Sequence, residues 1–153
     1  MNTVKHLNGS SLPPLRKKRY LFWIKTYIPA MLLGSLLGTY IDLYFVEKKI
    51  YLYPIRPYPE IFSINIVFTL VMLPVFIFVF LYMMKKVNGW GKAGIVLFLS
   101  LFMPIMEKLT EMVGMFAHSN EWKHLYSTGG YFIFLTVIYS FFHWMVNKNK
   151  SQD

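Results

Sequence analysis

The segment "AGIVLFLSLFMPIMEKLTEMVGM", residues 93–115, is apolar over most of its length but carries Glu107, Lys108 and Glu111 near its end. A helix needs roughly 20 mainly apolar residues to cross a bilayer, so this segment has the length of a transmembrane helix. An ionised side chain at the centre of such a helix costs about 3 kcal/mol. The two glutamates therefore need partners that offset the cost of removing them from water.

The apolar composition extends over the whole chain. Of its 153 residues, 56% are hydrophobic and 15% are charged, against about 25% charged residues in ordinary soluble domains. A soluble protein of this size has much surface to cover and needs more polar side chains. The chain has no cysteine, which excludes disulfides, thiolate metal sites and cysteine nucleophiles. This composition favours a bilayer as the solvent for most of the chain.

Four stretches are long and apolar enough to span a membrane, at about residues 20–45, 61–83, 93–115 and 131–146. They are expected to be helices, because hydrocarbon cannot solvate the unpaired backbone groups of an open hairpin. Three of the stretches contain an interior proline, which predicts a kink: Pro29, Pro74 and Pro104. We therefore predict an all-α fold, an integral membrane four-helix bundle.

The distribution of polar residues divides the chain into three parts. Residues 1–19 are predicted to form a basic, disordered cytoplasmic N-terminus, because the first fourteen are mostly polar and "RKKR" follows them. Residues 20–146 are predicted to form the transmembrane domain, and residues 147–153 a cytoplasmic tail.

The basic residues predict how the bundle is oriented. One side of the membrane collects the larger set: Lys5, Arg16, Lys17, Lys18, Arg19, Lys25, Lys85, Lys86, Lys92, Lys148 and Lys150. The other side has only Lys48, Lys49, Arg56 and Lys123. Because cytoplasmic loops carry an excess of Lys and Arg, both termini are expected in the cytoplasm. The net charge of +9 does not indicate nucleic acid, since no nucleic-acid-binding motif accompanies it.

Glu107 and Glu111 are one helical turn apart and share a face. The same face continues to Pro104 on one side and towards His118 on the other, which makes a polar stripe on an apolar helix. Lys108 points roughly 100° away from Glu107. Two carboxylates this close repel each other unless one is protonated or a cation neutralises them. We therefore expect both to face the interior of the bundle.

The stretch "YPIRPYP", residues 53–59, offers a candidate cation. Its three prolines stiffen the backbone around Arg56, which could hold the guanidinium over the mouth of the bundle. Arginine favours bidentate pairing with carboxylates. The sequence therefore predicts that Arg56 pairs with Glu107, Glu111 or Asp42.

The candidate polar cluster consists of Glu107, Glu111, Arg56, Asp42 and His118. The favoured interpretation is a latch that fixes the order of the helices. A second is a route for a proton or cation, since intramembrane acids commonly mark such routes. A metal site that adds His124 has no recognised ligand spacing. A hydrolytic site lacks a nucleophile constellation. We predict no catalytic residue, metal or cofactor.

The motif "GSLLG" places Gly34 and Gly38 four residues apart in an apolar span. Such a pair permits a close helix contact, either within the chain or in a dimer. Packing within the chain is the favoured interpretation.

Several motifs together resemble a known group of proteins. They are "YPIRPYP" before a span, "MEKLTEM" late in the next, the loop "EWKHLYS" and the final span "YFIFLTVIYSFFHWM". This combination, over about residues 51–144, resembles a family of small uncharacterised multi-pass membrane proteins of endospore-forming Gram-positive bacteria. The matching positions are Tyr53, Pro54 and Arg56, then Glu107 and Glu111, then Trp122. The resemblance implies a bacterial plasma-membrane location and gives no chemistry.

The sequence thus predicts an integral plasma-membrane protein. The first functional hypothesis is a non-enzymatic structural or accessory protein, which acts with a membrane-protein partner or as a homo-oligomer in the lipid bilayer. The alternative is a small oligomeric transporter or channel subunit that uses Glu107 and Glu111 for a proton or cation.

Overall fold

The computed structural model describes residues 15–120 and 122–151. Over these residues the elements follow in the order α1 (Leu15–Glu47), β1 (Tyr51–Leu52), the π-helical turn η1 (Phe68–Met72), α2 (Leu73–Lys86), α3 (Gly89–Met112), β2 (Ala117–His118) and α4 (His124–Lys150). The fold is therefore all-α apart from one two-stranded ribbon, as the composition predicted.

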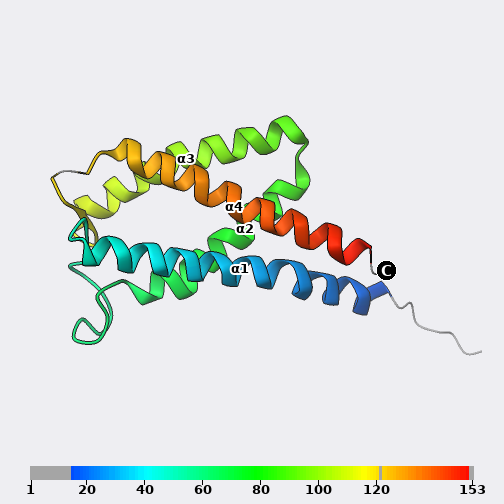
Figure 1. The fold of residues 1–153 in the computed structure, drawn as a ribbon, viewed down its shortest axis with the longest axis horizontal. Helices are drawn as coiled ribbons and strands as arrows, with labels where there is room; N and C mark the ends of the chain where they lie inside the picture. The colour runs from blue at the N-terminus through cyan, green and yellow to red at the C-terminus, as the bar shows by residue number, and fades with distance from the viewer. Residues whose placement is uncertain (1–14, 121, 152–153) are drawn as a thin grey trace, which may run out of the picture.

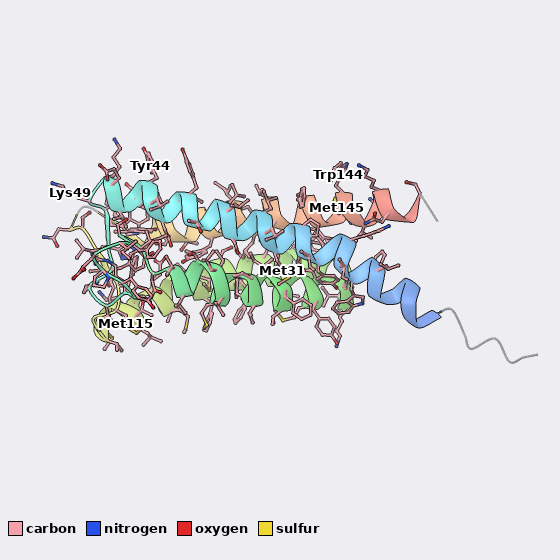
Figure 2. All side chains as sticks on the ribbon, turned by 90° about the horizontal axis from the view of Figure 1, so that it is seen from below. Met31, Tyr44, Lys49, Met115, Trp144 and Met145 are labelled. Carbon is pink, nitrogen blue, oxygen red and sulfur yellow. The ribbon has the colours of Figure 1, made fainter. Side chains whose placement is uncertain are left out.

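The four α-helices of the described residues run alternately up and down as a bundle (Figure 1). The start of α1 and the end of α4 lie at one end, which we call the terminal end. Residues 48–67, 113–120 and 122–123 gather at the opposite end, which we call the loop end (Figure 1). Figure 2 places Lys49 and Met115 at the loop end and Trp144 at the terminal end.

The helices carry four stretches long and apolar enough to cross a membrane, and in the second of them η1 continues into α2: Leu21–Glu47, Phe68–Lys86, Gly89–Met112 and Leu125–Asn149. No more than a third of the side chains in these stretches are buried inside the bundle. Large apolar side chains point outward from every helix, among them Leu36, Val75, Phe98 and Ile133. A surface this apolar matches hydrocarbon rather than water, so the bundle is that of an integral membrane protein.

The helices differ in extent from the predicted spans. Helix α1 begins at Leu15, so residues 15–19 belong to a helix rather than to a disordered tail. Leu, Lys and Arg are good helix formers, which explains the extension. Residues 1–14 lie outside the described part of the chain. Helix α4 is longer than predicted, because its polar ends remain helical beyond the apolar core.

The second span begins later than residue 61. The side chain of Asn65 accepts a hydrogen bond from the Phe68 amide at 3.2 Å and thereby satisfies one of the free donors of the helix start. The turn η1 follows, and in it the Leu73 amide donates to the Phe68 carbonyl five residues earlier. Pro74 comes directly afterwards and has no amide hydrogen to continue the regular ladder. The π-helical turn therefore lies at the point where proline interrupts the ladder.

The two glycines of the GxxxG motif lie at a close contact within the chain. A methyl group added at Gly34 would meet the side chain of Ile77 on α2 at 2.1 Å, and one added at Gly38 would meet Leu73 at 2.3 Å. Gly34 also faces Ile138 on α4. The main core surrounds this contact, with Ile77, Phe80 and Ile138 fully buried. Glycine therefore allows α1 to approach α2 closely enough to pack this core.

The glycine contact predicts the effect of enlarging these residues. Gly34→Val should lower the free energy of unfolding by about 1–3 kcal/mol, because the added atoms overlap Ile77 and force the helices apart. Gly94→Val is the matched control, since nothing lies within 4 Å of a methyl group added there. The measurement is unfolding in mixed micelles followed by circular dichroism. Equal losses in the two variants would contradict this role of Gly34.

Candidate functional site

The polar cluster forms where α3 ends and the chain turns back over the bundle. Gly114 adopts a φ of 76°, a conformation that favours glycine, and its amide donates to the Glu111 carbonyl at 2.9 Å. Four residues later the chain pairs with β1, where His118 lies opposite Tyr51. His118 was expected on the same helical face as the glutamates. It reaches them instead from β2, because the helix stops before it.

His118 lies between the two glutamates of α3. Its Nδ1 is 2.5 Å from Glu111 Oε1, and its Nε2 is 3.6 Å from Glu107 Oε2. The backbone amide of His118 also donates to Glu111 Oε1, at 3.3 Å. The side chains of His118, Glu107 and Glu111 are only 5%, 10% and 16% exposed. One imidazole thus joins two carboxylates that face the interior, as the helical spacing predicted.

Two further side chains complete the partners of the glutamates. The Tyr131 hydroxyl, from α4, donates to Glu107 Oε1 at 2.7 Å. Lys108 Nζ lies 2.9 Å from Glu111 Oε2, with the lysine more than half exposed. Lys108 was placed away from the face of Glu107, but a residue three positions before Glu111 reaches that carboxylate across one turn. We call Glu107, Glu111, His118 and Tyr131 the carboxylate cluster.

Aromatic rings enclose the imidazole of His118. The Trp122 ring stacks on it with centroids 5.5 Å apart and planes at 4°. Phe116 and Tyr51 meet it edge-on, at 4.5 and 5.1 Å. Trp122 is fixed in turn by a hydrogen bond from its Nε1 to Ser127 Oγ at 2.9 Å. The imidazole is therefore held in one orientation, with its nitrogens directed at the carboxylates.

A second polar contact joins α1 to the loop end. Asp42 is nine-tenths buried, and the hydroxyl of Tyr53 hydrogen-bonds to it. Tyr51 hydrogen-bonds to Ser127 on α4. Burial raises the pKa of Tyr53 and of Tyr51 above the ordinary tyrosine value, and nearby carboxylates raise both further. Both phenols therefore keep their protons at neutral pH, and the Tyr53 hydroxyl donates to Asp42.

Arg56 does not join this cluster. Its guanidinium donates to three backbone carbonyls of its own loop: Tyr53 at 2.6 Å, Phe62 at 2.7 Å and Pro59 at 3.3 Å. No ion pair within 4.0 Å joins it to Asp42, Glu107 or Glu111, all of which the structure describes. The expected pairing with a carboxylate is therefore not formed. The guanidinium closes a tight turn in which Tyr58 adopts a left-handed φ of 50°.

The cluster does not have the arrangement of a metal centre. Within residues 15–120 and 122–151, no group of three or more His, Asp or Glu side chains is placed to hold a metal ion. The side chain of His124, which was considered as an additional ligand, lies outside the described part of the structure. The chemistry available to the described residues is the sharing of protons among two carboxylates, an imidazole and a phenol.

The sequence reasoning missed Tyr131 and the aromatic enclosure. Tyr131 was assigned only as the start of an apolar span, because a tyrosine near a span boundary is common. Its role depends on the packing of α4 against α3, and no local signal shows it. Trp122 was named only as one of the positions that carry the family resemblance, although its ring covers His118.

The helices, their outward apolar surface and the buried cluster define an all-α, multi-pass integral membrane protein. Comparison with known proteins adds no relative, since no family model, curated protein or solved structure matches the chain. The function must therefore be inferred from the arrangement of the residues themselves.

Double-mutant cycles should show that Glu111 is coupled to His118 and not to Arg56. Arg56→Met and Glu111→Gln should change the free energy of unfolding additively, within about 0.5 kcal/mol, because the two residues share no contact. His118→Gln and Glu111→Gln should instead couple by about 0.5–3 kcal/mol. Unfolding in mixed micelles provides both values. A coupling of Arg56 to Glu111 as large as that of His118 would contradict the described geometry.

Removal of the Tyr131 hydroxyl should destabilise the bundle. Tyr131→Phe leaves Glu107 Oε1 without its donor, which should cost about 1–3 kcal/mol of unfolding free energy. Tyr40→Phe is the control, since Tyr40 is 69% exposed on α1. A loss no larger than that of Tyr40→Phe in the same unfolding assay would mean that the hydrogen bond does not stabilise the fold.

Proposed function

We propose that this chain is a non-enzymatic structural or accessory protein of a bacterial plasma membrane, with both termini in the cytoplasm. The proposal rests on the contacts that the carboxylates of this cluster make within the chain. Tyr131 and Lys108 each occupy an oxygen of one glutamate, and His118 bridges the two. Groups that bind one another in this way stabilise the fold and leave little capacity to bind a substrate.

The cluster connects segments that are distant in the sequence. It joins the end of α3, the ribbon strand β2 and the start of α4, while Tyr53 extends the polar contacts to Asp42 on α1. The loop end is thereby held as one rigid surface on the opposite side of the membrane from the termini. A rigid surface of this kind suits a protein that presents a fixed face to a membrane-protein partner.

One observation favours a second function, the transport of a proton. Glu107 Oε2 is fully buried and accepts no hydrogen bond, and His118 Nε2 is 3.6 Å away. The exposed Lys108, Glu111, His118 and Glu107 form a continuous series of polar groups from the surface into the bundle. Such a series could pass a proton inward, although a pathway across the whole membrane would need further groups.

Reconstitution tests the two functions against each other. We expect proteoliposomes to show no more proton flux than protein-free liposomes under an imposed pH gradient, as reported by a trapped pH-sensitive dye. Chemical crosslinking in the native membrane should capture one stoichiometric partner or a second copy of the chain. Flux that Glu107→Gln abolishes in folded protein would overturn the structural role and support transport. Tyr40→Phe, at an exposed position of α1, is the control for the effect of substitution.

A further inference from the structure

The loop formed by residues 53–62 projects sideways from the loop end of the bundle (Figure 1), and we call it the proline loop. It contains three prolines: Pro54, Pro57 and Pro59. Three of its large apolar or amphipathic side chains are more than half exposed: Ile55 at 57%, Tyr58 at 69% and Ile61 at 73%. Apolar side chains that gather on one exposed segment mark a contact with a membrane or with another protein.

The proline loop is held rigid by contacts within itself. The guanidinium of Arg56 donates to three carbonyls of the loop, those of Tyr53, Pro59 and Phe62. The left-handed φ of 50° at Tyr58 is a costly conformation, which persists only where the surrounding contacts fix it. The exposed side chains of the loop are therefore held outward before any partner arrives.

Much of the backbone of this loop is satisfied without water. Its three prolines have no amide hydrogen that needs an acceptor. The Arg56 guanidinium covers three carbonyls, and the Tyr58 carbonyl accepts the amides of Ile61 and Phe62 at 2.9 and 3.0 Å. Backbone groups that enter an apolar medium must be paired, because nothing there hydrates them. The loop therefore suits surroundings that are poorer in water than those of an ordinary surface loop.

The apolar surface of the loop continues into the lipid-facing surface of the helices. A recess of about 260 Å³ joins the two, and its lining includes Ile61 and Phe62 of the loop together with Leu43 of α1 and Leu70 of η1. Leu43 and Leu70 belong to stretches that cross the membrane, and they are 45% and 63% exposed. Hydrocarbon that covers these two leucines therefore also reaches the loop.

The depth that fits the loop is that of the lipid headgroups. The membrane stretch of the second span begins at Phe68, shortly after the loop ends. Glu60, within the loop, is exposed, and its carboxylate needs hydration. The exposed phenol of Tyr58 is typical of the boundary between membrane and water, as is that of Tyr44 near the loop end of α1 (Figure 2). The headgroup region offers water to Glu60 and apolar contact to the rest of the loop.

We propose that the proline loop lies in the boundary between headgroups and acyl chains of the leaflet at the loop end, with Ile55, Tyr58 and Ile61 directed into lipid. The partner of this surface is the bilayer rather than a protein, because the recess makes it continuous with the lipid-facing surface of the helices. Interfacial anchors set the tilt of membrane helices, so the loop fixes how this end of the bundle sits in the bilayer. The proposal does not depend on whether the carboxylate cluster is structural or passes protons.

Nitroxide labels on the full-length protein test the proposal. The chain has no cysteine, so a label can be attached at one introduced cysteine at a time, in Ile55→Cys and in Ile61→Cys. Each labelled protein is reconstituted in liposomes of phosphatidylcholine and phosphatidylglycerol. Power-saturation electron paramagnetic resonance then compares the access of oxygen, which concentrates in hydrocarbon, with that of a water-soluble nickel chelate.

Two reference positions calibrate the measurement. Leu36→Cys, at a side chain 69% exposed on the first span, gives the value for lipid, and Lys48→Cys, at the exposed end of α1, gives the value for water. Both loop labels should show a ratio of oxygen to chelate access between these two values. A ratio equal to that at Lys48 would overturn the proposal, because the loop would then stand in water. Immobile labels shielded from both reagents would also overturn it, in favour of a contact with a second copy of the chain.

A second arm tests the part that Arg56 plays. Arg56→Gln leaves carbonyls of the loop without their donor, so the label at Ile61 should become more mobile and its ratio should shift towards that at Lys48. Lys49→Gln is the matched control, since it removes one positive charge from the same end of the bundle but lies outside the loop, and it should leave the label unchanged. An unchanged ratio in folded Arg56→Gln protein would overturn the role of Arg56 in holding the loop in lipid. If Arg56→Gln does not fold, the two labels in the otherwise unchanged chain decide.

Discussion

A carboxylate on a membrane-spanning helix must be neutralised or hydrogen-bonded where it lies, since hydrocarbon cannot hydrate it. Glu107 and Glu111 are two such carboxylates near the end of α3. The imidazole of His118 lies between them and contacts both. The arrangement of the loop end follows from this contact. Helix α3 ends at Met112, the chain reverses at Gly114, and β2 pairs with β1 so that His118 faces back towards the helix.

The remaining features of the loop end hold the imidazole in place. Trp122 covers one face of the ring, and Phe116 and Tyr51 block its edges. A histidine held in this way cannot rotate away from the carboxylates without disrupting an aromatic cluster. The polar and aromatic contacts therefore support each other, as expected for a buried network in a medium of low dielectric constant.

Charged side chains make different kinds of contact at the two ends of the bundle. At the loop end, three carboxylates bind side chains of the same chain. Tyr131 binds Glu107, Lys108 binds Glu111, and the Tyr53 hydroxyl binds Asp42. At the terminal end, four lysines lie against aromatic rings: Lys85, Lys86, Lys92 and Lys148.

The sequence by itself determined that this protein lies in a lipid bilayer and that it is a bundle of helices. Four apolar stretches, each long enough to cross a bilayer, required helices because lipid satisfies no backbone group, and the one-turn spacing of Glu107 and Glu111 placed both on one inward face. The exact helix ends were less predictable, since capping by Asn65 and the turn at Gly114 depend on local geometry.

Only the tertiary structure decided which partners the glutamates take. Arg56 was the obvious cation by charge, yet backbone carbonyls of its own stiff loop are nearer and satisfy its guanidinium. Tyr131 and His118 lie 24 and 7 residues from the carboxylates they bind, across a helix contact and a chain reversal. Periodicity along one helix carries no information about contacts of that kind, because they are set by how separate elements pack.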